Sequence, residues 1–179
     1  MIEYIEQNNP LFIEAYGATT REKRENETGK MYFISHDEFE QLIDKNLLIE
    51  YCIYRNNYYG VLKSELEKLR ERYVMFNVGY SSAQVIQSMQ KSTFMIYLLP
   101  PNKEELLRRL GDRGYERYLL GIEETVNNAE KFDYLLLSQT DNLKGTYEDF
   151  MNIVEQKNDY QKSKMVLARN KDFIKNFYK

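Results

Sequence analysis

The sequence predicts an α/β fold, in which helices cover a sheet of parallel strands. Segments rich in β-branched and aromatic residues alternate along the chain with charged segments of helical periodicity. Residues 93–99 are almost uniformly apolar, which is typical of a parallel strand covered on both faces, and Pro100-Pro101 ends this run. At 179 residues, with 42% hydrophobic and 30% charged residues, the chain suits one domain with its own core.

In the first half of the chain, β-forming residues predict strands at residues 11–16, 31–34, 47–54 and 73–78, with a turn at 56–57. Periodicity predicts helices at residues 1–9, 64–72 and 81–90. Ser35-His-Asp-Glu38 reads as a capping box, because Ser35 and Glu38 can each accept a hydrogen bond from the other's backbone N–H. The capping box opens a helix whose apolar face is formed by Phe39, Leu42 and Ile43.

In the second half, we expect a helix at residues 103–113, a helix at 118–131 and a short buried strand at 134–137. The first of these helices is expected to turn Leu106, Leu107 and Leu110 inward. The tail, residues 155–179, is rich in lysine and carries Val166, Phe173 and Phe177 on one helical stripe. This basic amphipathic extension could pack on its own domain, contact a second copy or a protein partner, or meet an anionic surface.

Composition and residue counts exclude several classes of function. A formal net charge of -3 argues against a general nucleic-acid binder. Cys52 is the only cysteine, which excludes a disulfide framework and a thiolate zinc site, and we expect it to be a small buried hydrophobe. His36 is the only histidine, and we expect no metal site. The N-terminus has no signal-peptide pattern and the apolar run at residues 94–99 is too short to span a bilayer, so we expect a cytoplasmic protein without membrane contact.

The clearest functional signal lies at residues 18–33. Arg21, Lys23 and Arg24 fall on a loop predicted between two strands, and Glu27 follows three positions on. A guanidinium presents a planar fork of donors that matches the oxygens of a phosphate, so two arginines three apart can bind one phosphate from two sides. The same charges also suit an ordinary solvated surface turn.

This segment resembles the GMP-binding segment of guanylate kinases. The resemblance rests on Thr19-Thr20-Arg21, Arg24, Glu27, Gly29, Tyr32 and Phe33. It continues in the same order through Phe39, Ile49-Glu50, Asn57-Tyr-Tyr-Gly60, Leu106, Arg109-Leu110, Arg113-Gly114 and Phe132-Asp-Tyr134. It covers residues 4 to 154, and several blocks in the right order are far more specific than any one of them.

The resemblance implies a role for each matching residue. Arg21, Arg24, Tyr32 and Tyr59 match the residues that hold the GMP phosphate. Glu50 matches the carboxylate that accepts hydrogen bonds from the guanine edge, where guanine offers two adjacent donors and adenine presents an acceptor at the ring nitrogen. Glu27 matches a residue that lies behind the arginines and orients them.

Other positions depart from the family pattern. Gly17 stands where the family usually has a serine that assists guanine recognition, and Val61 replaces the hydroxyl that follows the Tyr-Gly pair. Asn77 and Gly79 stand where the resemblance leads us to expect two aspartates at the end of a strand. The loss of these aspartates removes negative charge near the place where the family binds metal and nucleotide. We therefore expect a weakened but recognisable GMP site, with Asn77 among its substrate-binding residues.

Members of this family begin with a buried strand and a Gly-x-x-x-x-Gly-Lys-Ser/Thr loop that cradles the ATP phosphates. The sequence starts after that point and contains no substitute loop. The resemblance thus implies no ATP or Mg²⁺ site unless a phosphate loop is supplied, and most of the catalyst would be lost without one. Arg109 and Arg113 match lid arginines that reach toward the transferred phosphate, but residues 121–127 hold no arginine where a second pair is expected.

The resemblance therefore predicts a P-loop-kinase-like parallel sheet flanked by helices, with its first strand missing, and a small GMP-binding-type β subdomain. Residues 1–154 would form this guanylate-kinase-like domain and residues 155–179 the extension. Neighbouring strands, the tail, a second chain or upstream residues could take the place of the missing strand. The first hypothesis for function is a GMP-binding protein without ATP-dependent phosphotransfer. The alternatives are an interaction module that binds a phosphorylated partner at the former GMP site, and an active guanylate kinase whose phosphate loop comes from elsewhere.

Overall fold

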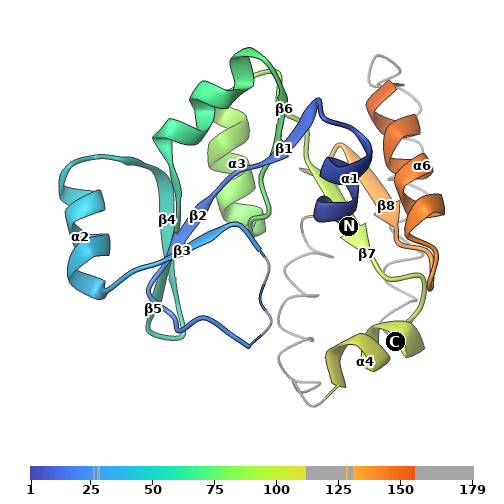
Figure 1. The fold of residues 1–179 in the computed structure, drawn as a ribbon, viewed down its shortest axis with the longest axis horizontal. Helices are drawn as coiled ribbons and strands as arrows, with labels where there is room; N and C mark the ends of the chain where they lie inside the picture. The colour runs from blue at the N-terminus through green and yellow to red at the C-terminus, as the bar shows by residue number, and fades with distance from the viewer. Residues whose placement is uncertain (26, 28, 112–127, 129–130, 156–179) are drawn as a thin grey trace. The chain divides into compact units, whose positions relative to one another are not determined.

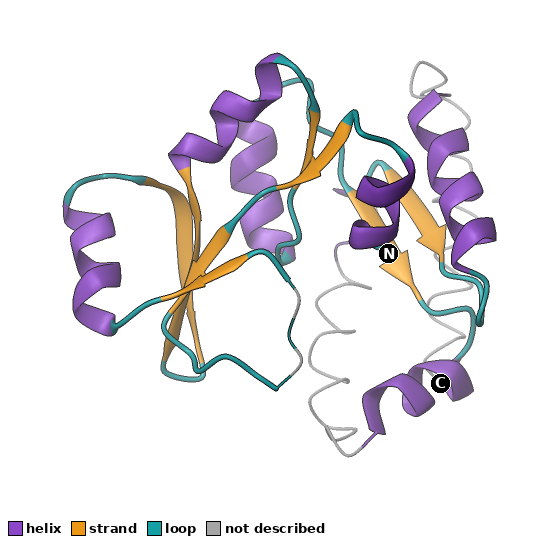
Figure 2. Cartoon of the chain, viewed as in Figure 1, coloured by secondary structure: helices purple, strands orange, loops and turns teal. Residues whose placement is uncertain are grey.

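The computed structural model describes residues 1–25, 27, 29–111, 128 and 131–155, without the side chains of residues 69 and 70. The chain forms two compact units, an N-terminal unit at Ile2–Thr93 and a C-terminal unit that starts at Phe94. Both units combine helices with strands, and parallel pairs of strands occur in each (Figures 1 and 2). The prediction of an α/β fold with parallel strands is confirmed.

The N-terminal unit begins with α1 (Ile2–Asn8), which contacts β1 (Phe12–Glu14). The helix ends two residues before Pro10, as the sequence predicts, because the residue before a proline is disfavoured in the helical region. β1 pairs in parallel with β6 (Tyr73–Met75). The facing rings of Phe12 and Tyr73 stack with their centroids 5.0 Å apart.

A four-stranded sheet with the order β3-β2-β5-β4 forms the rest of the unit's strands. β2 (Gly17–Thr19) pairs in parallel with β3 (Met31–Phe33) and antiparallel with β5 (Asn57–Leu62). The strand expected at residues 11–16 is therefore the shorter β1, and a second strand that the sequence analysis did not predict, β2, follows it in a different sheet. The break falls at Tyr16, whose backbone N–H donates to the Glu65 carboxylate at 2.8 Å and not to a neighbouring strand.

β4 (Leu48–Tyr54) completes this sheet by pairing antiparallel with β5, a strand that the sequence analysis did not predict. The turn between them is formed by Arg55 and Asn56, both at positive φ (50° and 62°), one residue earlier than expected. Cys52 is exposed, so its predicted burial is wrong. The reason is that β4 lies at the edge of the sheet and residues 51–54 are all exposed.

α2 (His36–Asp44) covers one face of the four-stranded sheet. The predicted capping box is present, with the Ser35 Oγ accepting from the Glu38 N–H at 3.2 Å and the Ser35 N–H donating to the Glu38 carboxylate at 2.8 Å. Phe39 is fully buried against Ala18 and Leu48, and Leu42 and Ile43 pack against this cluster. The predicted apolar face of the helix is confirmed.

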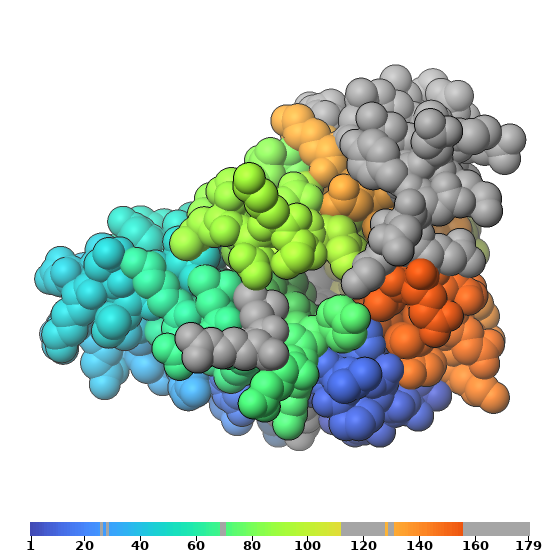
Figure 3. Space-filling view, turned by 90° about the horizontal axis from the view of Figure 1, so that it is seen from above, coloured from blue at the N-terminus to red at the C-terminus, as the bar shows by residue number. Residues whose placement is uncertain are grey.

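α3 (Tyr80–Met89) covers the opposite face of the same sheet, because successive strand residues point to opposite sides. Its Ile86 packs with Ile49 of β4 and Val61 of β5. The outer face of α3 lies at the surface (Figure 3). Val85 and Met89 of this helix are exposed. The charged helix expected at residues 64–72 is the 3₁₀ helix η1 (Lys63–Arg70), which contacts β5 and β6.

In the C-terminal unit, β7 (Ile96–Leu99) pairs in parallel with β8 (Tyr134–Leu137). α6 (Leu143–Glu155), which the sequence analysis did not predict, packs on β8 and buries Phe150 and Val154. β7 is not covered on both faces within the described residues, because Leu98 is 45% exposed.

α4 (Lys103–Leu110) begins at Asn102, whose side chain accepts from the Glu105 N–H at 2.8 Å. The predicted inward position of Leu107 is wrong: Leu107 is 40% exposed while Glu105 is buried. Glu105 can be buried because two arginines of the same helix neutralise its carboxylate. The predicted helix at residues 118–131 falls almost wholly outside the described residues, as do residues 156–179 of the extension.

Candidate functional site

The loop between β2 and β3 is held by an ion pair between Arg21 and Glu27. Arg21 Nη1 donates to Glu27 Oε2 at 2.8 Å, and Arg21 Nη2 donates to Glu27 Oε1, so the pair is bidentate. Both side chains are largely enclosed, at 14% and 18% exposed. Glu27 also accepts from the Arg24 backbone N–H at 3.1 Å. One carboxylate therefore fixes both the first guanidinium and the course of the loop.

The electrostatics of the pair keep both groups charged. Hydrogen bonding from Arg21, helped by the backbone N–H of Arg24, lowers the pKa of Glu27 to about 2. The pKa of Arg21 is raised, first by its hydrogen bond to Glu27 and to a smaller extent by Tyr59. Arg21 therefore stays charged, and the carboxylate of Glu27 sets the orientation of its guanidinium.

The rest of the sheet supports this guanidinium. Tyr59 lies opposite Thr19 across β2 and β5, and its phenol group contributes to the raised pKa of Arg21. The Arg21 guanidinium lies 5.2 Å from the centroid of the Phe33 ring, which is a cation–π distance. Thr19 is fully buried, and its hydroxyl donates to the Tyr58 carbonyl at 2.8 Å. Strands on both sides of the loop therefore hold its first arginine in place.

Two of the predicted phosphate ligands are exposed. The Arg24 side chain has no hydrogen-bond or ion-pair partner in the part of the chain that the structure describes. Tyr32 is 46% exposed, and its ring stacks on Tyr16 at 4.9 Å between centroids. No contact between Tyr32 and Arg21 is present among the described residues. Arg24 and Tyr32 are thus available to a ligand, whereas Arg21 is already engaged.

Glu50 lies in the same sheet as this loop, in a row of three facing positions. Gly17 of β2 faces Val61 of β5, and Val61 faces Glu50 of β4. The two positions at which the chain lacks an expected hydroxyl, Gly17 and Val61, are therefore direct neighbours of each other. Val61 is also the cross-strand neighbour of the carboxylate.

Glu50 is half-buried and has no ion-pair partner among the described residues. Burial raises its pKa, and hydrogen bonding from the Ser82 hydroxyl partly opposes this rise. Ser82 lies on α3 and is only 5% exposed. The sequence analysis missed Ser82, and the only available signal was its position four residues before Ile86, which places both on one face of the helix.

The remaining predicted residues are Asn77, Arg109 and Arg113. Asn77 is exposed in the segment between β6 and α3, and no hydrogen bond joins it to Arg21, Glu50 or Tyr59 among the described residues. Arg113 lies outside the described residues. No group of three or more histidine, cysteine or carboxylate side chains that could hold a metal ion occurs within the residues searched, which are the described ones.

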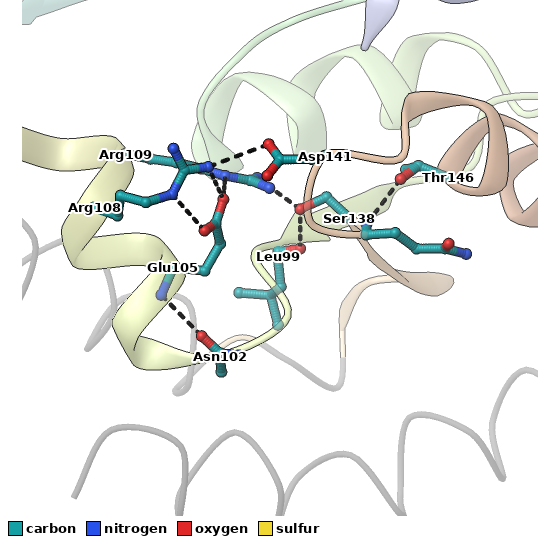
Figure 4. A network of polar contacts seen from close by, with 9 residues as sticks. Leu99, Asn102, Glu105, Arg108, Arg109, Ser138, Asp141 and Thr146 are labelled. Carbon is teal, nitrogen blue, oxygen red and sulfur yellow. Dashed lines mark hydrogen bonds and ion pairs between the residues drawn. The ribbon is translucent and has the colours of Figure 1, made fainter.

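Arg109 lies in the C-terminal unit, in a polar network shown in Figure 4. Its Nε donates to the Glu105 carboxylate at 2.6 Å and its Nη1 donates to the Ser138 hydroxyl at 2.8 Å. Ser138 in turn donates to the Leu99 carbonyl at 3.0 Å. Arg109 thus ties α4 to the carboxyl ends of β7 and β8. Hydrogen bonding from Arg108 and then Arg109 lowers the pKa of Glu105 to about 2.

Comparison with known proteins places the chain in a family. The family model for guanylate kinase matches residues 5–157. A guanylate kinase of Blochmanniella pennsylvanica is 34% identical over 136 residues, and that of Mycoplasmoides gallisepticum is 33% identical over 160 residues. These matches cover 70% and 84% of this chain, and 64% and 81% of the respective relatives. The α/β fold and the family match agree, and the chain belongs to the guanylate kinase family.

A solved structure supports the fold. The crystal structure of guanylate kinase from Anaplasma phagocytophilum matches with a TM-score of 0.68 at 24% sequence identity. The match covers 87% of this chain and 79% of that one. No helix within the described part of the chain is long and apolar enough to cross a membrane.

Proposed function

We propose that this chain binds GMP at the arginine loop and the adjoining sheet, and that its own residues do not transfer phosphate from ATP. The observation that carries the proposal is the Arg21–Glu27 pair, which is assembled beside Tyr59 in a member of the guanylate kinase family. The sheet that supports the pair also carries the half-buried carboxylate of Glu50.

At the phosphate end, Arg21, Arg24, Tyr32 and Tyr59 would donate to the phosphate oxygens. The guanidinium of Arg21 is already oriented by Glu27, so little of its conformational freedom would be lost on binding. Arg24 and Tyr32 are exposed and can move onto the ligand. Hydrogen bonds to a charged group contribute about 1.5–3 kcal/mol each.

At the base end, Glu50 would accept hydrogen bonds from the N1–H and the 2-amino group of guanine. Adenine presents an acceptor at N1, which would face the carboxylate lone pairs and be rejected. Glu50 suits this task because no cation among the described residues competes for its oxygens.

The second part of the proposal concerns phosphotransfer. The eight glycines of the sequence are scattered and form no Gly-x-x-x-x-Gly-Lys-Ser/Thr loop, which is the element that positions ATP phosphates and Mg²⁺. Arg109, the matched lid arginine, is bound to Glu105 and Ser138. An active guanylate kinase is the alternative, in which a phosphate loop comes from another segment or chain.

A second candidate is an interaction module for a phosphorylated protein. This alternative is supported by the contrast between a complete phosphate end and a base end that lacks hydroxyls at Gly17 and Val61. Glu50 distinguishes the two, because a base-reading carboxylate has no evident use toward a phosphopeptide.

Calorimetric titration of the full chain with GMP, with AMP and ATP as controls, tests the proposal. We expect GMP to bind, AMP to bind at least tenfold more weakly, and ATP to give no signal. The Arg21→Ala variant should lose most of the GMP affinity. Equal binding of GMP and AMP would exclude base recognition by Glu50, and unchanged GMP binding by Arg21→Ala would show that the site is placed wrongly. Specific ATP binding or formation of GDP would exclude the second part of the proposal.

A further inference from the structure

We propose that Ser82 is the positioning residue that orients the Glu50 carboxylate for base recognition. The inference rests on the proposed GMP site and names one group within it. Ser82 belongs to neither the arginine loop nor the sheet, and no other residue of α3 has been assigned to the site.

The first support is packing. α3 lies against β4, and Ile86 of α3 is in the same buried cluster as Ile49 and Val61. Ser82 precedes Ile86 by four residues, so the two side chains share the face of α3 that meets the sheet. Ser82 is 5% exposed, whereas the neighbouring Ser81 is exposed. The Ser82 side chain is therefore enclosed between α3 and the sheet. Glu50 is the cross-strand partner of Val61, which packs on Ile86, so Glu50 lies on the same face of the sheet as α3.

The second support is what the sheet lacks around the carboxylate. Val61, the cross-strand neighbour of Glu50, is apolar and 4% exposed. Gly17, next in the same row, has no side chain at all. Neither strand offers a donor at these positions, and no ion pair to Glu50 is present in the described residues. The Glu50 carboxylate is therefore oriented by α3, the helix that packs against β4.

A positioned donor matters here because the terminal torsion of a glutamate side chain is broad and roughly two-fold. A hydroxyl bound to one carboxylate oxygen fixes the plane of the group. The free lone pairs can then accept two parallel N–H bonds from one edge of a base. Without the hydroxyl the carboxylate rotates, and the second of the two bonds is weakened first.

The test compares GMP with IMP, whose base keeps N1–H but lacks the 2-amino group. We expect Ser82→Ala to reduce GMP affinity about tenfold and IMP affinity less, so that the preference for GMP over IMP falls. Ser81→Ala removes an exposed hydroxyl from the adjacent position of the same helix and should leave both affinities unchanged. Ser82→Thr keeps the hydroxyl and should keep the preference for GMP.

A relocation variant separates positioning from packing. Threonine is close to valine in shape, and Val61 faces Glu50 directly, so Val61→Thr offers a new hydroxyl from the opposite side. In the Ser82→Ala background, Val61→Thr should restore part of the preference for GMP over IMP. Val61→Thr alone is the control: positioning predicts a larger gain in the Ser82→Ala background than in the wild type, and an equal gain in both would overturn it.

The outcomes distinguish the inference from the proposed function. If Glu50→Gln leaves GMP binding unchanged, the base site itself is wrong and the inference fails with it. If Glu50→Gln weakens GMP binding while Ser82→Ala leaves the preference for GMP over IMP unchanged, the proposed function stands and the role of Ser82 is overturned. A loss in Ser82→Ala that is equal for GMP and IMP would also overturn it, since positioning predicts an unequal loss.

Discussion

The two ends of the candidate site are organised in opposite ways. At the phosphate end, Arg21 is bound in two places to Glu27, and the pKa of that carboxylate falls to about 2. At the base end, Glu50 has no cationic partner among the described residues, and burial raises its pKa. One end is a complete ion pair, and the other is a half-buried carboxylate without an ion-pair partner in the described part of the chain.

The two ends also differ in how far apart in the sequence their residues lie. The phosphate end is largely local, because Arg21 and Glu27 are six residues apart on one loop. The base end depends on β4, β5 and α3, which bring together Glu50, Val61 and Ser82. A site built from neighbouring residues is little affected by small changes in packing. The base end depends on the register of the sheet and on the packing of α3 against β4.

The largest effect is expected at the phosphate end. Arg21→Ala removes the oriented guanidinium and leaves Glu27 as an unpaired negative charge facing the phosphate. We expect affinity to fall about 100-fold for GMP and by a similar factor for ribose 5-phosphate, because both ligands share the phosphate. Competition calorimetry with the two ligands measures this.

Arg72→Ala is the matched control for Arg21→Ala, since it removes the same charge at an exposed position outside the site. A fall of the same size in Arg72→Ala would mean that net charge alone attracts the ligand. A loss in Arg21→Ala that affected GMP but spared ribose 5-phosphate would contradict the assignment of this arginine to the phosphate.

A smaller and more selective effect is expected at the base end. Glu50→Gln replaces one acceptor oxygen by a donor NH₂, so one of the two hydrogen bonds to guanine is lost. We expect about a tenfold loss for GMP and none for ribose 5-phosphate. Equal losses for the two ligands, measured in the same titrations, would show that Glu50 does not contact the base.

The two ends should also differ in their response to pH. The base end needs Glu50 ionised, and its pKa is raised above the ordinary value of 4.5. As pH falls through that raised value, the carboxylate is protonated and the extra affinity for GMP disappears. Glu27, with its pKa at about 2, stays ionised throughout.

Because the phosphate of the ligand also titrates near pH 6, the quantity to measure is the ratio of GMP to ribose 5-phosphate affinity. This ratio should be highest near neutral pH and should fall as the pH is lowered through the raised pKa of Glu50. In Glu50→Gln the ratio should be low and flat across the same range. A wild-type ratio that did not change with pH would contradict the role of an ionised Glu50.

The contrast between residues close in sequence and residues brought together by packing also decides how much of the site can be predicted from the sequence. Arg21, Arg24 and Glu27 lie in one short segment, and their spacing predicts a charged loop that the structure shows closed by the ion pair. Ser82 could not be predicted, because its partner is 32 residues away and the distance is closed only by the packing of α3 on β4. The exposure of Cys52 was missed for a related reason, since strand composition does not reveal that β4 lies at an edge.

The same limit applies to the fold. The alternation of strands and helices and the Ser35–Glu38 capping box are local signals, and both predictions are confirmed. The break between β1 and β2 depends on the Glu65 carboxylate, which accepts from the Tyr16 backbone N–H and lies 49 residues from it in the sequence. Burial of Glu105 in place of Leu107 depends on the arginines that neutralise it, and apolar periodicity gives no sign of such a pairing.

The smallest expected effect is that of Tyr59→Phe. This change removes the phenol oxygen that helps to raise the pKa of Arg21 while keeping the ring, and the bidentate bond to Glu27 remains to hold the guanidinium. We therefore expect about a threefold loss of affinity, equal for GMP and ribose 5-phosphate, because one hydrogen bond at the phosphate end is lost and the arginine stays in place.

Combining Tyr59→Phe with Glu27→Gln removes both groups that are expected to hold the Arg21 guanidinium. The combined loss of affinity should exceed the product of the two single losses, because either Tyr59 or Glu27 alone is expected to keep the Arg21 guanidinium in place. Strictly multiplicative losses would show that Tyr59 and Glu27 act on the ligand independently and not through Arg21.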